Sequence, residues 1–242
     1  MSVYVMSDAH GLKNLYDAMM KELSLRDEDT LYVLGDMIDR GADGIAILRD
    51  LMRRPNVKML LGNHEYMMRQ YYQALYEDMD EYLKREYITR WKHNGNRPTL
   101  EQFECLSKEQ QEEILTYIAQ LPLAYPDVEV KGRHYYLVHG CPQQGFFEDV
   151  VTRDMVSSHG CSVENFVWDR IEQGMPLFED RCVIVGHTPT VFLQNNRPYA
   201  IWHDQKELEK SKLIDIDCGC AAANEHSRLA VLCLDDLSVL YF

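Results

Sequence analysis

Short apolar runs that each end in a glycine-containing polar motif recur along this chain, and they constrain its fold more than any other feature. The first three runs cover residues 3–6, 31–34 and 57–61, and each predicts a buried strand. Apolar residues at helical spacing separate the first run from the second and the second from the third. Alternating strands and helices predict parallel strands joined by right-handed crossovers, as in an α/β protein.

A long helical stretch follows before strand signals return. The stretch at about 66–120 is rich in Glu, Lys, Met, Tyr and Leu, and Ser107 with Gln110 forms a capping-box pattern that predicts a helix over 108–119. We expect one domain over 1–242 with a helical cap or insertion at about 66–120. Further strands are predicted at 127–130, 135–138, 182–185, 200–202, 228–234 and 237–241, the last two as a hairpin.

The charge balance argues against nucleic-acid partners. The chain has 25 basic and 39 acidic residues, a net charge of −14, whereas a protein that tracks a nucleic-acid backbone needs a basic stripe. No apolar run approaches the roughly 18–20 residues that span a bilayer, and Asp8 and His10 come too early for a secretory signal. Seven cysteines in such a chain predict reduced thiols in a cytoplasmic protein, with Cys218 and Cys220 buried or in a loop.

Polar residues gather where the predicted strands end, in five ordered sets. The sets are Ser7-Asp8-Ala9-His10-Gly11, Gly35-Asp36-Met37-Ile38-Asp39-Arg40-Gly41, Gly62-Asn63-His64-Glu65, His139-Gly140 and Gly186-His187-Thr188-Pro189. Open α/β sheets bind ligands beyond the carboxyl ends of their strands. We therefore expect the five sets to converge on one edge of the fold.

The donor atoms in these sets favour metal binding. Carboxylate, amide and imidazole groups without thiolate suit manganese, iron or zinc. Any one of these residues alone is more typical of a turn or a helix cap, but five ordered sets are hard to explain by turn chemistry. Six donors exceed the needs of one tetrahedral ion and suit two ions that share the Asp36 carboxylate. The six are Asp8, His10, Asp36, Asn63, His139 and His187.

These motifs resemble those of a known family. Asp-x-His-Gly, Gly-Asp-x-x-Asp-Arg-Gly and Gly-Asn-His-Glu at these spacings are similar to the phosphoprotein phosphatases, which belong to the calcineurin-like metallophosphoesterases. The two later histidine motifs also match. Asn94-Gly95 with Thr99-Leu100 resembles a stretch of bacterial members, and Ile216-Asp217-Cys218-Gly219 resembles a late Ile-Asp-Thr-Gly strand. The resemblance implies an α/β fold in four layers, a β-sandwich flanked by helices, with two metals at one edge.

The resemblance also implies a role for each residue. One ion would be held by Asp8, His10 and Asp36, and the other by Asp36, Asn63, His139 and His187. A water or hydroxide between the ions would attack phosphorus directly. His64 would protonate the leaving oxygen, Asp39 would orient His64, and Arg40 would hold phosphate oxygens. The implied cofactors are two divalent ions, with manganese expected and iron or zinc as alternatives.

One departure from the family pattern bears on the substrate. Protein-phosphatase members usually carry an arginine just before Gly-Asn-His-Glu, and Leu61 stands there in this chain. If Leu61 occupies the same place, an arginine introduced there should restore a second phosphate contact. If Leu61 is buried instead, an arginine there should cost stability. Arg170, in Trp168-Asp169-Arg170, is a candidate for a late substrate-binding arginine or, equally, a surface residue in an ion pair.

Three hypotheses about function follow. The first is a cytoplasmic dimetal phosphatase that acts on phosphoserine or phosphothreonine in proteins. The second is a hydrolase of small phosphorylated molecules such as dinucleoside polyphosphates. The third is a scaffold that retains the fold without catalysis, and the retention of all six donors together with His64 and Asp39 argues against it. No nucleic acid or membrane is expected as a partner.

Overall fold

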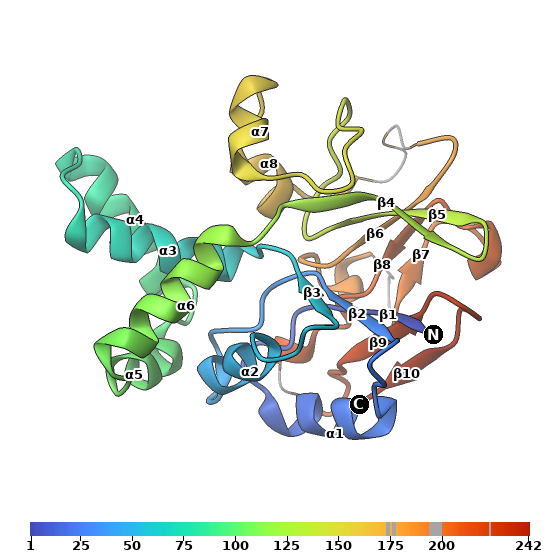
Figure 1. The fold of residues 1–242 in the computed structure, drawn as a ribbon, viewed down its shortest axis with the longest axis horizontal. Helices are drawn as coiled ribbons and strands as arrows, with labels where there is room; N and C mark the ends of the chain where they lie inside the picture. The colour runs from blue at the N-terminus through green and yellow to red at the C-terminus, as the bar shows by residue number, and fades with distance from the viewer. Residues whose placement is uncertain (173–174, 176–177, 194–199, 223) are drawn as a thin grey trace.

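The structure is a computed structural model, and it describes residues 1–242 apart from 173–174, 176–177, 194–199 and 223. In this part of the chain the strands form two five-stranded sheets, which lie face to face (Figure 1). The first sheet has the order β10-β9-β1-β2-β3 and the second β4-β5-β6-β8-β7. The predicted α/β sandwich is therefore confirmed.

The first sheet contains the parallel unit that the apolar runs predict. Its members are β1 (Val3–Met6), β2 (Thr30–Val33), β3 (Val57–Met59), β9 (Ala230–Cys233) and β10 (Val239–Tyr241). β1 and β2 pair in parallel, as do β2 and β3, with α1 (Lys13–Leu23) and α2 (Gly44–Leu51) as the crossovers. β9 and β10 form the expected antiparallel hairpin, and β9 pairs antiparallel with β1.

The second sheet contains one strand that the sequence analysis did not predict. Its members are β4 (Ala124–Val130), β5 (Arg133–Val138), β6 (Cys182–Val185), β7 (Trp202–His203) and β8 (Leu213–Asp215). β8 is the strand that was missed, because it is only three residues long and runs directly into a polar loop. The strand predicted at 200–202 is observed as β7, shifted toward the C-terminus and paired at the sheet edge with β8.

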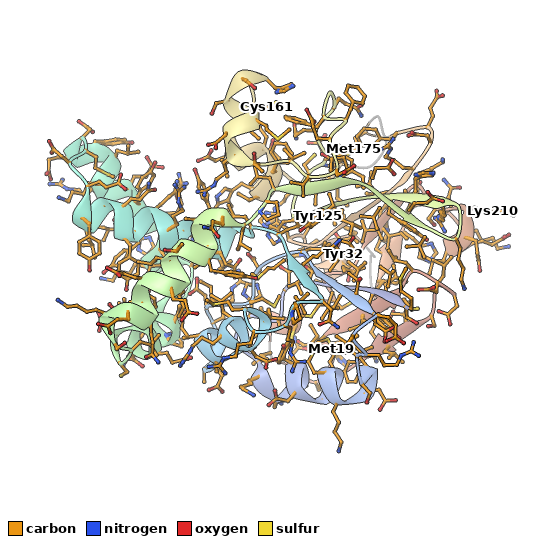
Figure 2. All side chains as sticks on the ribbon, viewed as in Figure 1. Met19, Tyr32, Tyr125, Cys161, Met175 and Lys210 are labelled. Atoms are coloured by element: carbon orange, nitrogen blue, oxygen red, sulfur yellow. The ribbon has the colours of Figure 1, made fainter. Side chains whose placement is uncertain are left out.

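The central strands of both sheets are covered on both faces, which explains why β1, β2, β6 and β9 read as continuous apolar runs. The edge strand β4 instead alternates between buried and exposed residues. One buried cluster lies between the sheets and includes Val5, Leu34, Leu137, Ile184 and Leu232. The other joins the outer faces to the helices. Figure 2 labels Tyr32 of β2 and Tyr125 of β4, whose rings meet edge to face with centroids 5.1 Å apart. None of the helices in the described part of the chain has the length and apolar composition needed to cross a bilayer.

The helical stretch projects to one side of the sandwich (Figure 1). It consists of α3 (Asn63–Tyr76), α4 (Glu81–His93), α5 (Arg97–Glu104) and α6 (Lys108–Gln120). The capping box of Ser107 and Gln110 is present at the start of α6, as predicted. α3 begins earlier than expected, so its first turn carries Asn63 and His64. The helices are thus built directly onto one of the five polar motifs.

Leu61 does not lie where an arginine would reach substrate. Its side chain is completely buried in the cluster that joins the sheets to the helices, and its backbone N–H donates to the carbonyl of Pro122 at 2.8 Å. The condition for a restored phosphate contact is therefore not met, and the alternative, a cost in stability, applies to this backbone. The side chain points into the apolar core rather than toward the polar edge.

We predict that Leu61→Arg destabilises the protein instead of changing its substrate preference. A charge placed there without a partner should lower the free energy of unfolding by about 3–5 kcal/mol. Leu61→Met is the matched control and should cost less than about 1.5 kcal/mol, because it conserves volume. Urea unfolding of both variants checks this. A Leu61→Arg protein with unchanged stability and faster phosphopeptide hydrolysis would contradict the placement of the side chain.

Candidate dimetal active site

The five polar motifs meet at one edge of the sandwich and are tied together through their backbones. The N–H of His10 donates to the carbonyl of Asp36 at 3.0 Å, and the N–H of Gly186 donates to the carbonyl of His139 at 2.9 Å. The N–H of His187 donates to Oδ2 of Asp8 at 3.1 Å. All six predicted donor side chains are buried here, at 7% exposure or less. The convergence expected from the sequence is observed.

Asp36 stands at the centre of this arrangement, with its two carboxylate oxygens directed to different histidines. Oδ1 lies 3.4 Å from Nε2 of His139, and Oδ2 lies 3.6 Å from Nε2 of His10. Asp8 flanks the first pair, with Oδ1 3.8 Å from the same His10 nitrogen. A carboxylate that bridges two cations directs one oxygen to each, and the two oxygens of Asp36 are arranged in this way.

Asn63 occupies the other side of the site. Its Oδ1 lies 2.9 Å from Nε2 of His139 and 2.9 Å from Nδ1 of His187. Ligand atoms of Asp36, His139 and His187 lie within 4.8 Å of one another, and so do those of His10, Asp36 and His64. Four of the six predicted donors thus fall into two adjoining groups that share Asp36, with Asp8 beside His10 and Asn63 beside His139. The first group also contains His64, which was not predicted as a ligand.

Backbone carbonyls determine which ring nitrogens face the site. Nδ1 of His10 lies 3.1 Å from the carbonyl of Ile38, and Nδ1 of His139 lies 3.0 Å from that of Leu34. A carbonyl only accepts, so each Nδ1 carries the proton and leaves the Nε2 lone pair toward Asp36. Metal-binding histidines commonly use this support.

His64 is held differently from the other histidines. Its Nδ1 lies 2.7 Å from Oδ2 of Asp39, and the same oxygen accepts a hydrogen bond from Nε1 of Trp91 at 2.7 Å. The backbone N–H of Asp39 donates to Oγ1 of Thr99 at 2.8 Å. Trp91 and Thr99 both hydrogen-bond Asp39, and neither contact was predicted from the sequence. The motif Asn94-Gly95 with Thr99-Leu100 was the available signal for Thr99. Asp39 thus orients His64 and is itself fixed by two helices.

Both candidate arginines lie at the rim of the site. The side chain of Arg40 is exposed, and its guanidinium donates to Nε2 of His10 and to Nε2 of His64, each at 3.1 Å. Arg170 donates from Nη1 to Oγ1 of Thr188 at 3.1 Å and lies beside the carbonyl of His187. Arg170 has no carboxylate partner among the described residues, so the alternative of a surface ion pair is not observed.

Glu65 is the buried residue whose role the sequence analysis missed. Oε1 accepts hydrogen bonds from the N–H groups of Met37 and Ile38 at 2.8 and 3.3 Å, and Oε2 accepts one from the N–H of Asp36 at 2.9 Å. In return, Oδ1 of Asp36 accepts from the N–H of His64 at 3.0 Å. These bonds connect the first turn of α3 to the loop after β2. The Glu in Gly-Asn-His-Glu was the available signal.

The site also concentrates backbone strain. Left-handed φ values are unusual for residues other than glycine and cost of order 1–3 kcal/mol each. Six of the residues with such values belong to the predicted site: Asp8 (56°), His10 (43°), Asp36 (59°), Asp39 (70°), Arg40 (66°) and His187 (67°). A Cβ added at Gly62 would collide with Oδ1 of Asp36. The glycine lets the start of α3 approach this carboxylate.

The electrostatics of the site suit cations. Burial raises the pKa of Asp39 and of Glu65 to about 7. Burial, followed by repulsion from neighbouring carboxylates, raises the pKa values of Asp36, Asp215 and Asp217 well above their usual range. Burial likewise lowers the pKa values of four histidines, that of His187 to about 2; the other three are His10, His64 and His139. Neutral imidazoles beside carboxylates form a donor set that fits divalent ions.

The sequence match now defines the class of protein. The chain matches the family model of the calcineurin-like phosphoesterases over residues 1–218 and belongs to this family of metal-dependent phosphoesterases. The symmetrical bis(5'-nucleosyl)-tetraphosphatase of Buchnera aphidicola subsp. Schizaphis graminum is 31% identical over 91 residues, 37% of this chain and 33% of that protein. The enzyme of the same name from Pectobacterium atrosepticum is 25% identical over 133 residues, 54% and 41% of the two chains.

These two alignments span a third to about two fifths of the curated relatives' length. Among solved structures, a protein serine/threonine phosphatase from Saccharomyces cerevisiae is similar, with a TM-score of 0.59 and 12% identity over 100% of this chain and 79% of that one. At this level of identity the likeness concerns the fold. The comparisons thus confirm the calcineurin-like metallophosphoesterase family, and they leave the phosphoprotein-phosphatase type and the substrate to be argued from the site.

We predict that the metal-free protein becomes less stable as pH rises from about 7 to about 8. Well above the ordinary histidine pKa of 6.5, the unfolded chain has released most of its imidazole protons, so the contribution of the histidines fades. In the folded state Asp39 and Glu65 still hold carboxyl protons that the unfolded chain lost near pH 4. The free energy of unfolding that these protons contribute is lost as pH rises through about 7. Thermal unfolding after chelation measures the effect. Added Mn²⁺ should abolish it, and a melting temperature that stays flat without metal would contradict the charge analysis.

We predict that Glu65→Gln weakens metal binding at a distance. The amide can accept hydrogen bonds through only one oxygen, so at least one buried N–H of the loop after β2 loses its acceptor, at a cost of about 1–3 kcal/mol. The loop would then hold Asp36 less firmly. Metal content and urea unfolding measure both effects, with Glu86→Gln on the surface of α4 as the control. Native metal content in Glu65→Gln would show that the loop does not depend on this carboxylate.

Proposed function

We propose that the protein hydrolyses phosphoanhydride bonds of dinucleoside polyphosphates at a centre of two divalent ions. The division of the Asp36 oxygens between His10 and His139 carries the dimetal part of this proposal. The substrate class is supported by the curated relatives, which are named symmetrical bis(5'-nucleosyl)-tetraphosphatases. The burial of Leu61 agrees with it, because the strand before Gly-Asn-His-Glu supplies no arginine to clamp a phosphoserine.

The metal ligands follow from the two groups of donors. Asp8, His10 and Asp36 would hold one ion, and Asp36, Asn63, His139 and His187 the other. When bound, two such ions would lower the pKa of a water molecule and offset the charge that develops on the phosphoryl oxygens. Manganese is the first candidate, and iron and zinc suit the same donors.

The chain's own residues would bind and protonate the substrate. Arg40 presents its planar fork toward Nε2 of His10 and of His64, where it can bind phosphoryl oxygens. Arg170 offers a second guanidinium beside His187. Once phosphoryl oxygens draw the guanidinium of Arg40 away from Nε2 of His64, that nitrogen would carry a proton to the leaving oxygen, with Asp39 stabilising the charged ring through Nδ1.

A phosphoserine and phosphothreonine protein phosphatase is the second candidate function. The spacing of the five motifs and the position of Arg170 beside Thr188 favour it. The two candidates differ in the bond that breaks. In a phosphoanhydride the leaving group is a phosphate, whereas in a phosphoester it is an alkoxide that needs a proton far more.

A panel of substrates distinguishes the two candidates. The purified enzyme would be supplied with Mn²⁺ and tested on dinucleoside tetraphosphates and on phosphoserine and phosphothreonine peptides. We expect kcat/KM to be higher for the dinucleoside tetraphosphates. Higher values for the peptides would replace the first candidate by the second, and inactivity on both classes with two metals bound would overturn the proposal.

We predict that His64→Asn separates substrates by their leaving groups. Loss of a general acid should reduce turnover by roughly 10²–10⁴-fold for an alkyl phosphate, whose leaving group requires the proton. The reduction should be smaller for p-nitrophenyl phosphate and for a phosphoanhydride. Metal content, measured beside the rates, should stay unchanged, because His64 is assigned to neither ion. Equal losses on all substrates would contradict the role of acid.

A further inference from the structure

A second group of charged side chains lies along α3, beyond the residues assigned to the metals. It contains Tyr66 and Arg69 of α3, Arg153 of α7 (Arg153–Ser158) and Glu164 of α8 (Val163–Val167). Tyr66 donates from its hydroxyl to Oε1 of Glu164 at 3.3 Å. In the described part of the chain neither Arg69 nor Arg153 has a hydrogen-bonded or ion-paired side-chain partner. Two helices, α3 and α7, thus each contribute an arginine that has no ion pair among the described residues.

Arg153 is the member whose position needs an explanation. Its Nη1 atom is buried and has no hydrogen-bond partner. Burial, and then repulsion from Arg69, lowers the pKa of its guanidinium, so the two arginines lie close enough to destabilise one another. An unpartnered buried donor ordinarily costs about 1–3 kcal/mol, and more when it is charged. Such a pair is stabilised when an anion binds between the two guanidinium groups.

The group begins directly after the Gly-Asn-His-Glu motif of the proposed metal centre. α3 starts at Asn63, so at a rise of 1.5 Å per residue Tyr66 and Arg69 lie roughly 4.5 and 9 Å further along the helix axis. Tyr66 and Arg69 are three residues apart and therefore share one face of α3. From α8, Glu164 bonds Tyr66, while Trp168 follows this helix and places its ring 5.9 Å from that of His187. α3 and α8 therefore both connect the arginine pair to the site.

We propose that Arg69 and Arg153 bind a phosphate group of the substrate that is not the one being hydrolysed. This inference rests on the proposed function, because a polyphosphate chain carries such a group and a phosphoserine does not. Arginine suits the task, since its planar fork donates two hydrogen bonds to one phosphate. The pair would therefore select substrates with several linked phosphates over monoesters.

The kinetic test compares substrates with one and with several phosphates. In Arg69→Gln and Arg153→Gln, kcat/KM for a dinucleoside tetraphosphate should fall by about 10-fold or more, mainly through KM, as for lost charge-assisted hydrogen bonds. Hydrolysis of p-nitrophenyl phosphate should stay within about twofold, since that substrate does not reach the pair. Arg97→Gln is the control, because Arg97 is exposed on α5 and pairs with Glu101. Equal losses on both substrates would overturn the assignment.

A binding test removes the dependence on turnover. Tripolyphosphate should raise the melting temperature of the chelated wild-type protein, and the rise should shrink in both variants but not in Arg97→Gln. Without ligand, Arg153→Gln should melt at or above the wild-type temperature, because an unpaired buried charge is removed. A lower melting temperature with an unchanged tripolyphosphate response would show that Arg153 is only structural. If tripolyphosphate raises the melting temperature as expected but the enzyme hydrolyses only phosphopeptides, the proposed function is refuted. The anion site at Arg69 and Arg153 would still be supported.

Discussion

The carboxylate of Glu65 connects the two segments on which the site depends. It accepts the backbone N–H groups of three successive residues after β2, while Asp36 in that loop accepts the N–H of His64 in α3. Without this reciprocal link the loop would have little reason to keep Asp36, Asp39 and Arg40 in left-handed conformations. The backbone strain of this loop therefore depends on the hydrogen bonds that Glu65 and Asp36 accept. Metal binding would add to this constraint, because ions held by the same loop are lost when the loop relaxes.

Charge imposes a second constraint. The chain carries a net −14, and its site holds several buried carboxylates, yet the proposed substrates are polyanions. Local cations have to invert the field where phosphate binds, and bound ions are the largest charges that can do so. Positive potential extends beyond the metal centre through four arginines, namely Arg40, Arg170, Arg69 and Arg153. The acidic surface elsewhere is then compatible with a phosphate-binding edge.

Much of this arrangement could be predicted from the sequence, because the site motifs follow strands that are apolar throughout. The parallel unit of the first sheet, the C-terminal hairpin and the convergence of the six donors all follow from the order of runs and motifs. The roles of Trp91, Thr99 and Glu65 could not be predicted in this way. Trp91 and Thr99 reach Asp39 across 52 and 60 residues, so their contribution exists only once α4 and α5 are packed.

Leu61 illustrates a physical reason why the sequence does not reveal which side chain before Asn63 faces the site. Leu60 packs between the two sheets, and Leu61 packs on the helical side, so both neighbours are buried. A strand with two apolar faces shows no alternation, and its sequence cannot reveal which residue faces the site. The structure resolves this by placing Leu61 in the core, which removes the second phosphate contact from the end of the strand. Positive charge for an additional phosphate is instead supplied by α3 and α7. That shift moves phosphate recognition from the metal centre toward the helices, where a longer polyphosphate chain would extend.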